Sequence, residues 1–574
     1  MSNTANASRR LQFLRSRADG GRCVREKELA TRASPISNGR RSELIASSPV
    51  CERAAQQQPQ PATLHQQLLG DSSGARSLAE HRLPRPRSGM DGEADAKRPR
   101  LEEDGDEEET RQHRRPASKS SSSRRTMARS RTRGPTAAAA RRRTAVPRTT
   151  RVEATGDAGT LLFSGGTNWD TIGRRPKDKK AAGGSGGSTE KNLWGPHRLA
   201  WPHRVKAVFS GCSACHTVLL TEEGQAYTWG RNDKGQLGQC DLKRRDVPAL
   251  VETLKDHLVV GAACGRSHTL FLTDHGSVFG CGDNKMGQCG VGSQNASVHV
   301  PTRVAFKLRP AVRVSCGGEF SVLVDCRGHA YTFGCPEYGQ LGHNTDGRYF
   351  VTSNKLQFKC ELVPRRVQVF IDRSREGHVV PVDDVRIVDV ASGLNHTIAL
   401  DERKRCFSWG FGGYGRLGHN EPKDEMVPRL IKAFDGPNRG LCSIHAGGTF
   451  SMALSELGVL YFWGMNNHGG EATMYPKPIQ DLTGWHVRGI GCSNKSIVVL
   501  ADESVISWGP HPTYGELGYG EGRQKSSTTP QEVRLLEGIH VHTVACGLGH
   551  SVFIARDDTE EERARIRRLP EYQP

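Results

Sequence analysis

Short apolar runs that end in Trp-Gly or a close variant recur along the later part of the chain. Nearly every residue in them is apolar or β-branched, which is typical of strands buried on both faces of a sheet. The seven glycines that close these runs are 65, 52, 52, 76, 54 and 45 residues apart: Gly165, Gly230, Gly282, Gly334, Gly410, Gly464 and Gly509. A repeat of about fifty residues, in which no unit can bury both of its own faces, predicts a propeller or a solenoid.

A second signature, a small residue followed by Gly-x-x-His, precedes most of these runs. Between the two signatures lies a predicted hairpin, as in the sequence HTVLLT, the turn EEGQ and the strand AYTWG. The signature is clearest at Cys264–His268, Ser392–His396 and Cys546–His550, and weaker copies place Phe320, Phe450 and Lys495 at the His position. Each unit therefore contains at least two antiparallel strands.

Each end of the repeat holds half a unit. The strand LLFSGG, starting at Leu161, has no Gly-x-x-His hairpin before it, and SVFIA, which follows His550, has no Trp-Gly strand after it. If the two halves pair, they complete one blade and leave no free sheet edge. We therefore expect an all-β, seven-bladed β-propeller over residues 159–557, closed by pairing of its N- and C-terminal strands. A short helix or tail over residues 558–574 would follow it.

The segment before the repeat has a different composition. Residues 1–150 carry 31 Lys and Arg against 17 Asp and Glu, and Phe13 is their single aromatic residue. Such a segment cannot bury enough apolar surface to offset the entropy of ordering it. We expect residues 1–158 to form a disordered basic tail.

Two basic clusters in this tail are typical of nuclear import and of loose contacts with phosphate groups. They suit nonspecific binding of nucleic acid. The alternative is that the charges only keep a disordered arm solvated. The clusters are Lys97, Arg98, Pro99 and Arg100, and Arg141, Arg142 and Arg143.

Several chemical motifs are absent or are better explained by the repeat. Cys212–His216 spells the attachment motif of a c-type haem, but His216 stands at the repeat position of His268, so we interpret it as a structural histidine. The sequence shows no second Cys pair at zinc-finger spacing, no nucleophile elbow and no nucleotide fingerprint. It also shows no secretory signal and no apolar run long enough to span a membrane. We expect an intracellular protein with free thiols, no metal, no cofactor and no covalent catalysis.

One unit is longer than its neighbours, because Gly334 and Gly410 are 76 residues apart against 52 in the two preceding units. Residues 367–382 predict two strands, VQVFI and VVPV, around a charged tip. A hairpin held by a rigid ring is a natural device for binding a partner. A tolerated surface insertion is the alternative, since a longer loop costs little closure entropy. The candidate binding residues are Asp372, Arg373, Ser374, Arg375, Glu376, Gly377, His378, Val379 and Val380.

The repeat blocks resemble the regulator of chromosome condensation family, seven-bladed propellers whose founder is a guanine-nucleotide exchange factor for Ran. The likeness covers about residues 160–574. Longer blocks, including GTNWDTIGR at Gly166, CPEYGQLGHN at Cys335 and WGFGGYGRLGH at Trp409, resemble the second member of that family. WD-repeat propellers fit less well, because Trp-Asp occurs only at Trp169.

The resemblance implies a regulator of small GTPases of the Ran, Rac or Ral type, acting by nucleotide exchange or by sequestration. Exchange by this family is a displacement without a covalent step. The founder contacts its GTPase through a protruding β-wedge, which implies a similar role for the hairpin over 367–382, although the two do not match residue by residue.

The resemblance also implies a role in mitosis and in cytoskeletal organisation. The implied partners are chromatin or centromere proteins and microtubules. The implied location is the nucleus, chromosomes and spindle, with some protein in the cytoplasm. The alternative is a chromatin or mitotic scaffold with no action on a GTPase.

Overall fold

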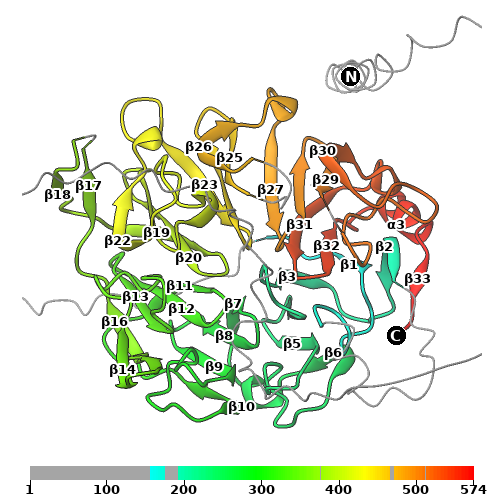
Figure 1. Cartoon of the computed structure of the whole chain (residues 1–574). Coiled ribbons are helices and arrows are strands. Elements are labelled where there is room, and N and C mark those ends of the chain that lie inside the picture. The colour runs from blue at the N-terminus through cyan, green and yellow to red at the C-terminus, as the bar shows by residue number, and fades with distance from the viewer. Residues whose placement is uncertain (1–155, 175–191, 375, 466–470, 511) are drawn as a thin grey trace, which may run out of the picture. The chain divides into compact units, whose positions relative to one another are not determined.

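The structure is a computed structural model that describes residues 156–174, 192–374, 376–465, 471–510 and 512–574. The predicted tail, apart from its last three residues, lies outside this part of the chain, and so do both basic clusters. Nearly all regular secondary structure in the described part is β-strand, and the main sheets form seven blades around a common axis (Figure 1). The predicted seven-bladed propeller is confirmed.

Six blades are each built from four strands that pair antiparallel in chain order, with the first strand of each blade near the axis. Blades 1 to 3 contain β3(Val205–Phe209), β4(His216–Thr221), β5(Ala226–Gly230) and β6(Arg245–Leu250); β7(Val259–Cys264), β8(His268–Thr273), β9(Val278–Asp283) and β10(Ser297–Arg303); β11(Ala311–Cys316), β12(Phe320–Asp325), β13(Ala330–Gly334) and β16(Glu361–Arg366). Blades 4 to 6 contain β19(Ile387–Ser392), β20(His396–Asp401), β21(Cys406–Gly410) and β22(Glu425–Leu430); β23(Leu441–Ala446), β24(Phe450–Ser455), β25(Leu460–Gly464) and β26(Thr473–Pro478); β27(Val487–Cys492), β28(Ile497–Ala501), β29(Ser504–Gly509) and β30(Ser527–Glu532).

The seventh blade joins the two ends of the propeller. It contains β31(Val541–Cys546) and β32(His550–Ala555) from the C-terminal part and β1(Thr160–Gly165) and β2(Leu193–Leu199) from the N-terminal part. Strand β1 pairs with β32 over its whole length, from Thr160 opposite Ala555 to Gly165 opposite His550. The predicted closure is therefore confirmed, and it removes the free edges that two half-blades would expose.

The C-terminal segment fastens the outside of this blade. Helix α3(Glu560–Arg567) begins with a capping box, in which Thr559 and Glu562 bond reciprocally to each other's backbone N–H. Its residue Ile566 is buried in the cluster that also holds Leu162 and Phe553. The chain then forms β33(Glu571–Tyr572), which pairs in parallel with the outer strand β2. The predicted short helix thus continues into a strand that covers the edge of the closing blade.

The Gly-x-x-His signature has a direct structural cause. The imidazole of each histidine folds back over the glycine three residues earlier. A Cβ atom at Gly265 would lie 2.1 Å from His268 Cε1, and one at Gly393 would lie 2.1 Å from His396 Cε1. A side chain of any size at the glycine would therefore displace the ring, which explains why the two residues recur together.

The same histidines join neighbouring blades through a belt of buried hydrogen bonds. His216 Nε2 lies 2.8 Å from Thr269 Oγ1 in the next blade, and Thr269 donates to the carbonyl of Gln236. The Thr269 hydroxyl is thereby used as a donor, so Nε2 carries the proton. The buried Nδ1 has no hydrogen-bond partner among the described residues. Equivalent contacts join His268 to Ser321, His396 to Ser451 and His550 to Thr217.

The fourth strand of every blade contains a proline, which blunts the open sheet edge in blades 1, 2, 3, 5 and 6. In blades 4 and 7 this edge is paired, with β17(Ile371–Arg373) and β33 respectively. Proline has no backbone N–H to donate to an incoming strand. The seven residues are Pro196, Pro248, Pro301, Pro364, Pro428, Pro476 and Pro530. These edges are poor templates for pairing with another chain.

The long unit contains two hairpins rather than one. The first, β14(Arg348–Thr352) and β15(Lys355–Phe358), lies in the connection from β13 to β16. The second, β17(Ile371–Arg373) and β18(Val379–Pro381), lies in the connection from β16 to β19. Because successive strands of a blade run in opposite directions, these two connections leave the blades at opposite ends. The two hairpins therefore stand on opposite faces of the ring.

Candidate partner-binding hairpin and adjacent cavity

The predicted hairpin over 367–382 is present as β17 and β18, at the rim of the propeller (Figure 1). Strand β17 also pairs in parallel with β22 of blade 4, with Ile371 opposite Arg429. The hairpin thus extends blade 4 into a six-stranded sheet. Ile371 and Phe370 are buried, and Phe370 packs edge-on against Phe407 at 5.2 Å between ring centroids. The base of the hairpin is therefore part of the core.

Two residues that the sequence places at the charged tip belong to a strand. Asp372 and Arg373 lie in β17, opposite Val380 and Val379, whereas residues 367–370 are not in a strand. The reason is that both charges bond to blade 4. Lys432 forms an ion pair with Asp372, and Arg373 Nη1 lies 3.0 Å from Glu425 Oε1.

The carboxylate of Glu425 is the centre of this attachment. Its residue is only 3% exposed, and it accepts hydrogen bonds from Arg373 and, at 2.8 Å, from Arg429. A buried carboxylate of this kind is stable only while its cations stay in place. The two ion pairs therefore hold the hairpin in one orientation against the rim of blade 4.

The tip itself is the turn from Ser374 to His378. Ser374 N–H donates to the His378 carbonyl at 2.9 Å, and Gly377 has a φ of +91°, a conformation that favours glycine. Beyond the turn, Val379 and Val380 are 53% and 57% exposed. Of the predicted binding residues, Glu376 to Val380 are thus on the surface and Asp372 and Arg373 are anchors. Arg375 lies outside the described residues.

Replacing Glu425 with Gln will loosen this hairpin. We expect a loss of about 2 kcal/mol in the free energy of unfolding, because Arg373 loses its carboxylate in a mostly buried site and Arg429 keeps only its ion pair with Glu421. Amide hydrogen exchange in residues 371–381 will rise. Glu361→Gln is the matched control, since Glu361 also opens an outer strand and pairs with an arginine four residues on, but that arginine is half exposed. Its loss will cost less than about 1 kcal/mol. Equal effects of the two variants would contradict this account.

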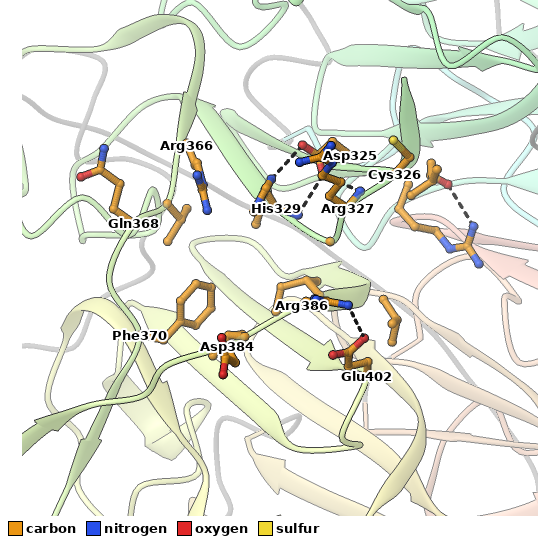
Figure 2. A pocket seen from close by; sticks show the side chains of 18 of the residues that line it. Asp325, Cys326, Arg327, His329, Arg366, Gln368, Phe370, Asp384, Arg386 and Glu402 are labelled. Atoms are coloured by element: carbon orange, nitrogen blue, oxygen red, sulfur yellow. Dashed lines mark hydrogen bonds and ion pairs between the residues drawn. The ribbon is translucent and has the colours of Figure 1, made fainter. Parts of the chain in front are cut away.

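A cavity of about 980 Å³ lies beside the base of the hairpin, between blades 3 and 4. Figure 2 shows its two walls. One wall is the turn between β12 and β13, with Arg327 and His329, together with Arg366 at the end of β16. The other wall carries Asp384, Arg386 and Glu402. The segments of chain on either side of the hairpin complete the lining.

The charged side chains that line the cavity differ in whether they form ion pairs. Asp325 is fully buried and accepts from His329 Nδ1 and from the backbone N–H groups of Arg327 and His329, so its charge holds the turn. Burial alone would raise the pKa of Asp325. The hydrogen bonds favour the charged carboxylate and leave this pKa below its ordinary value. Arg386 faces Glu402 at 3.6 Å. Within the described chain, Arg327 and Arg366 have no carboxylate at ion-pair distance. They are the cations available to a bound partner.

The motifs that resemble cofactor sites have structural roles. Cys212 and Cys215 are buried free thiols, and burial raises the pKa of Cys212 to about 11. His216 belongs to the hydrogen-bond belt. In the described ranges no group of three His, Cys, Asp or Glu side chains is placed to hold a metal ion. No helix in the same ranges combines the length and apolarity needed to cross a bilayer.

Sequence reasoning missed two features of this region, the pair of arginines in the cavity and the hairpin β14–β15. Arg327 and Arg366 are 39 positions apart, and nothing in the local pattern indicates that they share a cavity. The hairpin β14–β15 did leave a signal. RYFVT and KLQF are rich in aromatic and β-branched residues and are separated by Ser353–Asn354, a two-residue turn.

Comparison with known proteins identifies the family of this propeller. Residues 160–553 match the family model of the RCC1-like domain. The chain belongs to the RCC1-like domain family. It is 54% identical to protein RCC2 of Homo sapiens over 420 residues, which cover 72% of this chain and 80% of that protein. It is 52% identical to the RCC2 homolog of Xenopus laevis, over 72% of this chain and 81% of that protein. RCC2 is the telophase disc protein, so the narrower sequence resemblance is confirmed.

Solved structures show the same RCC1-like fold. Prp20p of Saccharomyces cerevisiae matches with a TM-score of 0.55 at 19% identity, covering 73% of this chain and 95% of its own. Human WBSCR16 matches with a TM-score of 0.55 at 22% identity, covering 70% of this chain and all of its own. At these identities the likeness concerns the fold alone. The partner-binding role of the hairpin and cavity therefore rests on the residues of this RCC1-like chain.

Proposed function

We propose that this protein regulates a small GTPase of the Ran, Rac or Ral type, and that the GTPase contacts the hairpin β17–β18 and the cavity beside it. The proposal rests first on membership of a family whose founder is an exchange factor. Prp20p, which shares the fold, has binding properties to Gsp1p and histones. The observation in this chain that carries the proposal is the ion-paired attachment of the hairpin through Glu425.

A fixed hairpin suits this task because exchange is a competition for contacts. The partner must lose contacts with its nucleotide as it gains contacts with the regulator, and a rigid element pays little entropy when it binds. Val379 and Val380 offer exposed apolar surface next to the tip, and Arg327 and Arg366 offer positive charge in the cavity. No covalent step and no cofactor of the regulator are needed. The nucleotide belongs to the GTPase.

Release of fluorescent GDP from Ran, Rac and Ral GTPases tests the proposal. The variant replaces Ser374–His378 with Gly-Ser-Gly-Ser-Gly and keeps Asp372 and Arg373, so that the hairpin stays attached to blade 4. We expect the affinity for the cognate GTPase to fall about tenfold or more, which corresponds to losing about 1.4 kcal/mol of interface contacts. Replacement of Glu456–Gly458, an exposed turn at the same end of blade 5, with Gly-Ser-Gly is the control.

The outcomes separate the two modes of regulation. Faster GDP release that depends on residues 374–378 identifies an exchange factor and its substrate. Tight binding with unchanged or slower release identifies sequestration. If both loop variants bind and act like the unaltered protein, the contact lies elsewhere on the propeller. If no GTPase binds at all, the proposed function is wrong.

The second candidate is a scaffold for chromatin or mitotic proteins that has no GTPase partner. The observation that favours it is the excess positive charge of residues 1–150, which suits contact with nucleic acid. Under either function we propose that the protein works in the nucleus and on mitotic chromosomes, at centromeres and the spindle, with a cytoplasmic pool. Microtubules and centromere proteins are the further proposed partners.

A further inference from the structure

The hairpin β14–β15 presents an unusual amount of apolar surface to solvent. Phe350 is 71% exposed, and Tyr349, Val351 and Leu356 are between 42% and 49% exposed. Phe350 lies directly opposite Leu356 in the ladder, so these two side chains share one face of the hairpin. Large side chains gathered in this way are characteristic of interaction surfaces.

The base of this hairpin is fastened to the propeller, although its strands project. Lys359 N–H donates to the Gly347 carbonyl at 2.8 Å across the base. Cys360 Sγ lies 3.7 Å from Met286 Sδ of blade 2, and Asn344 N–H donates to the Met426 carbonyl of blade 4 at 2.9 Å. Bonds to both neighbouring blades therefore fix the direction in which the hairpin points.

The edges of this hairpin are open. Its two strands form a separate two-stranded sheet, and in the described chain they pair only with each other. A two-stranded sheet alone is marginally stable in water, and its outer backbone groups can accept another strand. Unlike the outer strands of the blades, β14 and β15 contain no proline to prevent this.

The charge around the open sheet is positive. Lys355 and Lys359 lie on or next to β15 and have no carboxylate at ion-pair distance within the described ranges. Arg348 is paired, at 3.3 Å, with Asp346. The turn at the tip, Thr352 to Lys355, is polar, which disfavours insertion of the tip into a lipid bilayer. The partner that fits is an extended segment in which apolar and acidic residues alternate.

We propose that β14–β15 is a docking site for an extended segment of a partner protein, which adds a strand to the hairpin. Alternate apolar side chains of that segment pack on Phe350 and Leu356, and its carboxylates face Lys355 and Lys359. Main-chain hydrogen bonds supply affinity and the alternating side chains supply specificity. This site is on the opposite face from β17–β18 and does not depend on the proposed function.

Fluorescence polarisation with the full chain and three synthetic peptides tests the proposal. The first peptide alternates glutamate with valine and phenylalanine, the second replaces every glutamate with lysine, and the third is the first with alternate backbone amides N-methylated. We expect the acidic peptide to bind, and the lysine and N-methylated peptides to bind at least about tenfold more weakly. The double variant F350S/L356S should lose binding to the same degree. Leu308→Ser is the control, because Leu308 is also 71% exposed and lies outside the hairpin.

Each result either supports or overturns the docking site on β14–β15. Equal binding of the acidic and lysine peptides, or unchanged binding by F350S/L356S, overturns the site. Binding that tolerates N-methylation overturns strand addition. If phosphatidylserine vesicles bind the protein and F350S/L356S abolishes that binding, the hairpin faces lipid and the proposal is wrong. None of these outcomes changes the GDP-release result, so failure here is distinct from failure of the proposed function.

Discussion

Deleting residues 159–166 will leave a chain that cannot form a closed propeller. Strand β1 lies between β32 and β2, so its loss removes two sets of ladder hydrogen bonds at once. It also removes Leu161, Leu162 and Phe163, all at most 3% exposed, from two core clusters. Burying each such side chain contributes about 2–3 kcal/mol. The sum is comparable with the whole stability of an ordinary domain, about 5–15 kcal/mol.

Urea unfolding, followed by far-ultraviolet circular dichroism, measures this effect. A chain that begins at residue 156 and keeps β1 is the control, and it should unfold cooperatively. The single substitution Phe163→Ala gives a finer measure. Phe163 contacts Trp229 in blade 1 and stacks on Tyr572 in β33, so we expect a loss of about 3–5 kcal/mol. Phe350→Ala, at an exposed position, should change stability by less than about 0.5 kcal/mol. A cooperative transition of normal stability after deletion of β1 would show that the closing blade is dispensable.

Mild acid will destabilise the propeller through its belt of histidines. Burial lowers the pKa of His216, His268 and His550 to about 3, and it lowers the pKa of His396 well below the ordinary value. In the unfolded chain these groups titrate near 6.5. The folded state therefore binds fewer protons than the unfolded state at any pH between about 3 and 6.5. The histidines' contribution to stability is fully present above pH 6.5 and is lost as the pH drops below it.

The expected slope is large. Each such histidine contributes up to about 1.4 kcal/mol per pH unit, so four can contribute about 5 kcal/mol per unit once the unfolded chain is charged. Urea midpoints at pH 7.5, 6.5, 5.5 and 5.0 measure it above the range where carboxylates dominate. His268→Phe is the matched variant, since Phe320 and Phe450 already occupy the equivalent position in other blades. Its pH dependence should be shallower by one proton. Urea midpoints that do not move between pH 7.5 and 5.0 would refute this role of the belt.

The parts of the fold that the sequence predicts well are those fixed by local repeats. In most blades the glycine that closes the third strand and the His or Phe that opens the second stand at constant spacing, so the blades and the half-units at both ends follow from the pattern. Blade 6 differs, because Ser496 rather than the predicted Lys495 lies at the His position. The register of Gly165 opposite His550 joins the two signatures directly. The anchors of β17–β18 are different. Glu425 and Lys432 are more than fifty residues from their partners, and spacing carries no information about such contacts.

Blade 4 shows how one substitution changes a loop that the repeat treats as constant. In blades 1 to 3 a glutamine accepts from the backbone N–H two residues earlier, as Gln236 does from Lys234 at 2.9 Å. Arg416 stands at this position and has no acceptor, so its Nε donates to the Gly413 carbonyl instead. The intervening Tyr414 has a φ of +62°, a strained conformation for a tyrosine. The extra length between Gly334 and Gly410 could be read from the sequence, but its division between two hairpins could not. A count of residues does not show where an insertion is placed.

The pairing of β1 with β32 also delays completion of the closing blade until the end of synthesis. About 400 residues separate the two strands, and ribosomes add about 5–20 residues per second. Blades 1 to 6 can therefore assemble in order as they emerge, while β1 waits about 20–80 s for its neighbour. During that interval its apolar residues and its unpaired edge are open to other nascent chains. Synthesis of this protein should accordingly depend on chaperones that bind near the start of the propeller until the last strand is released.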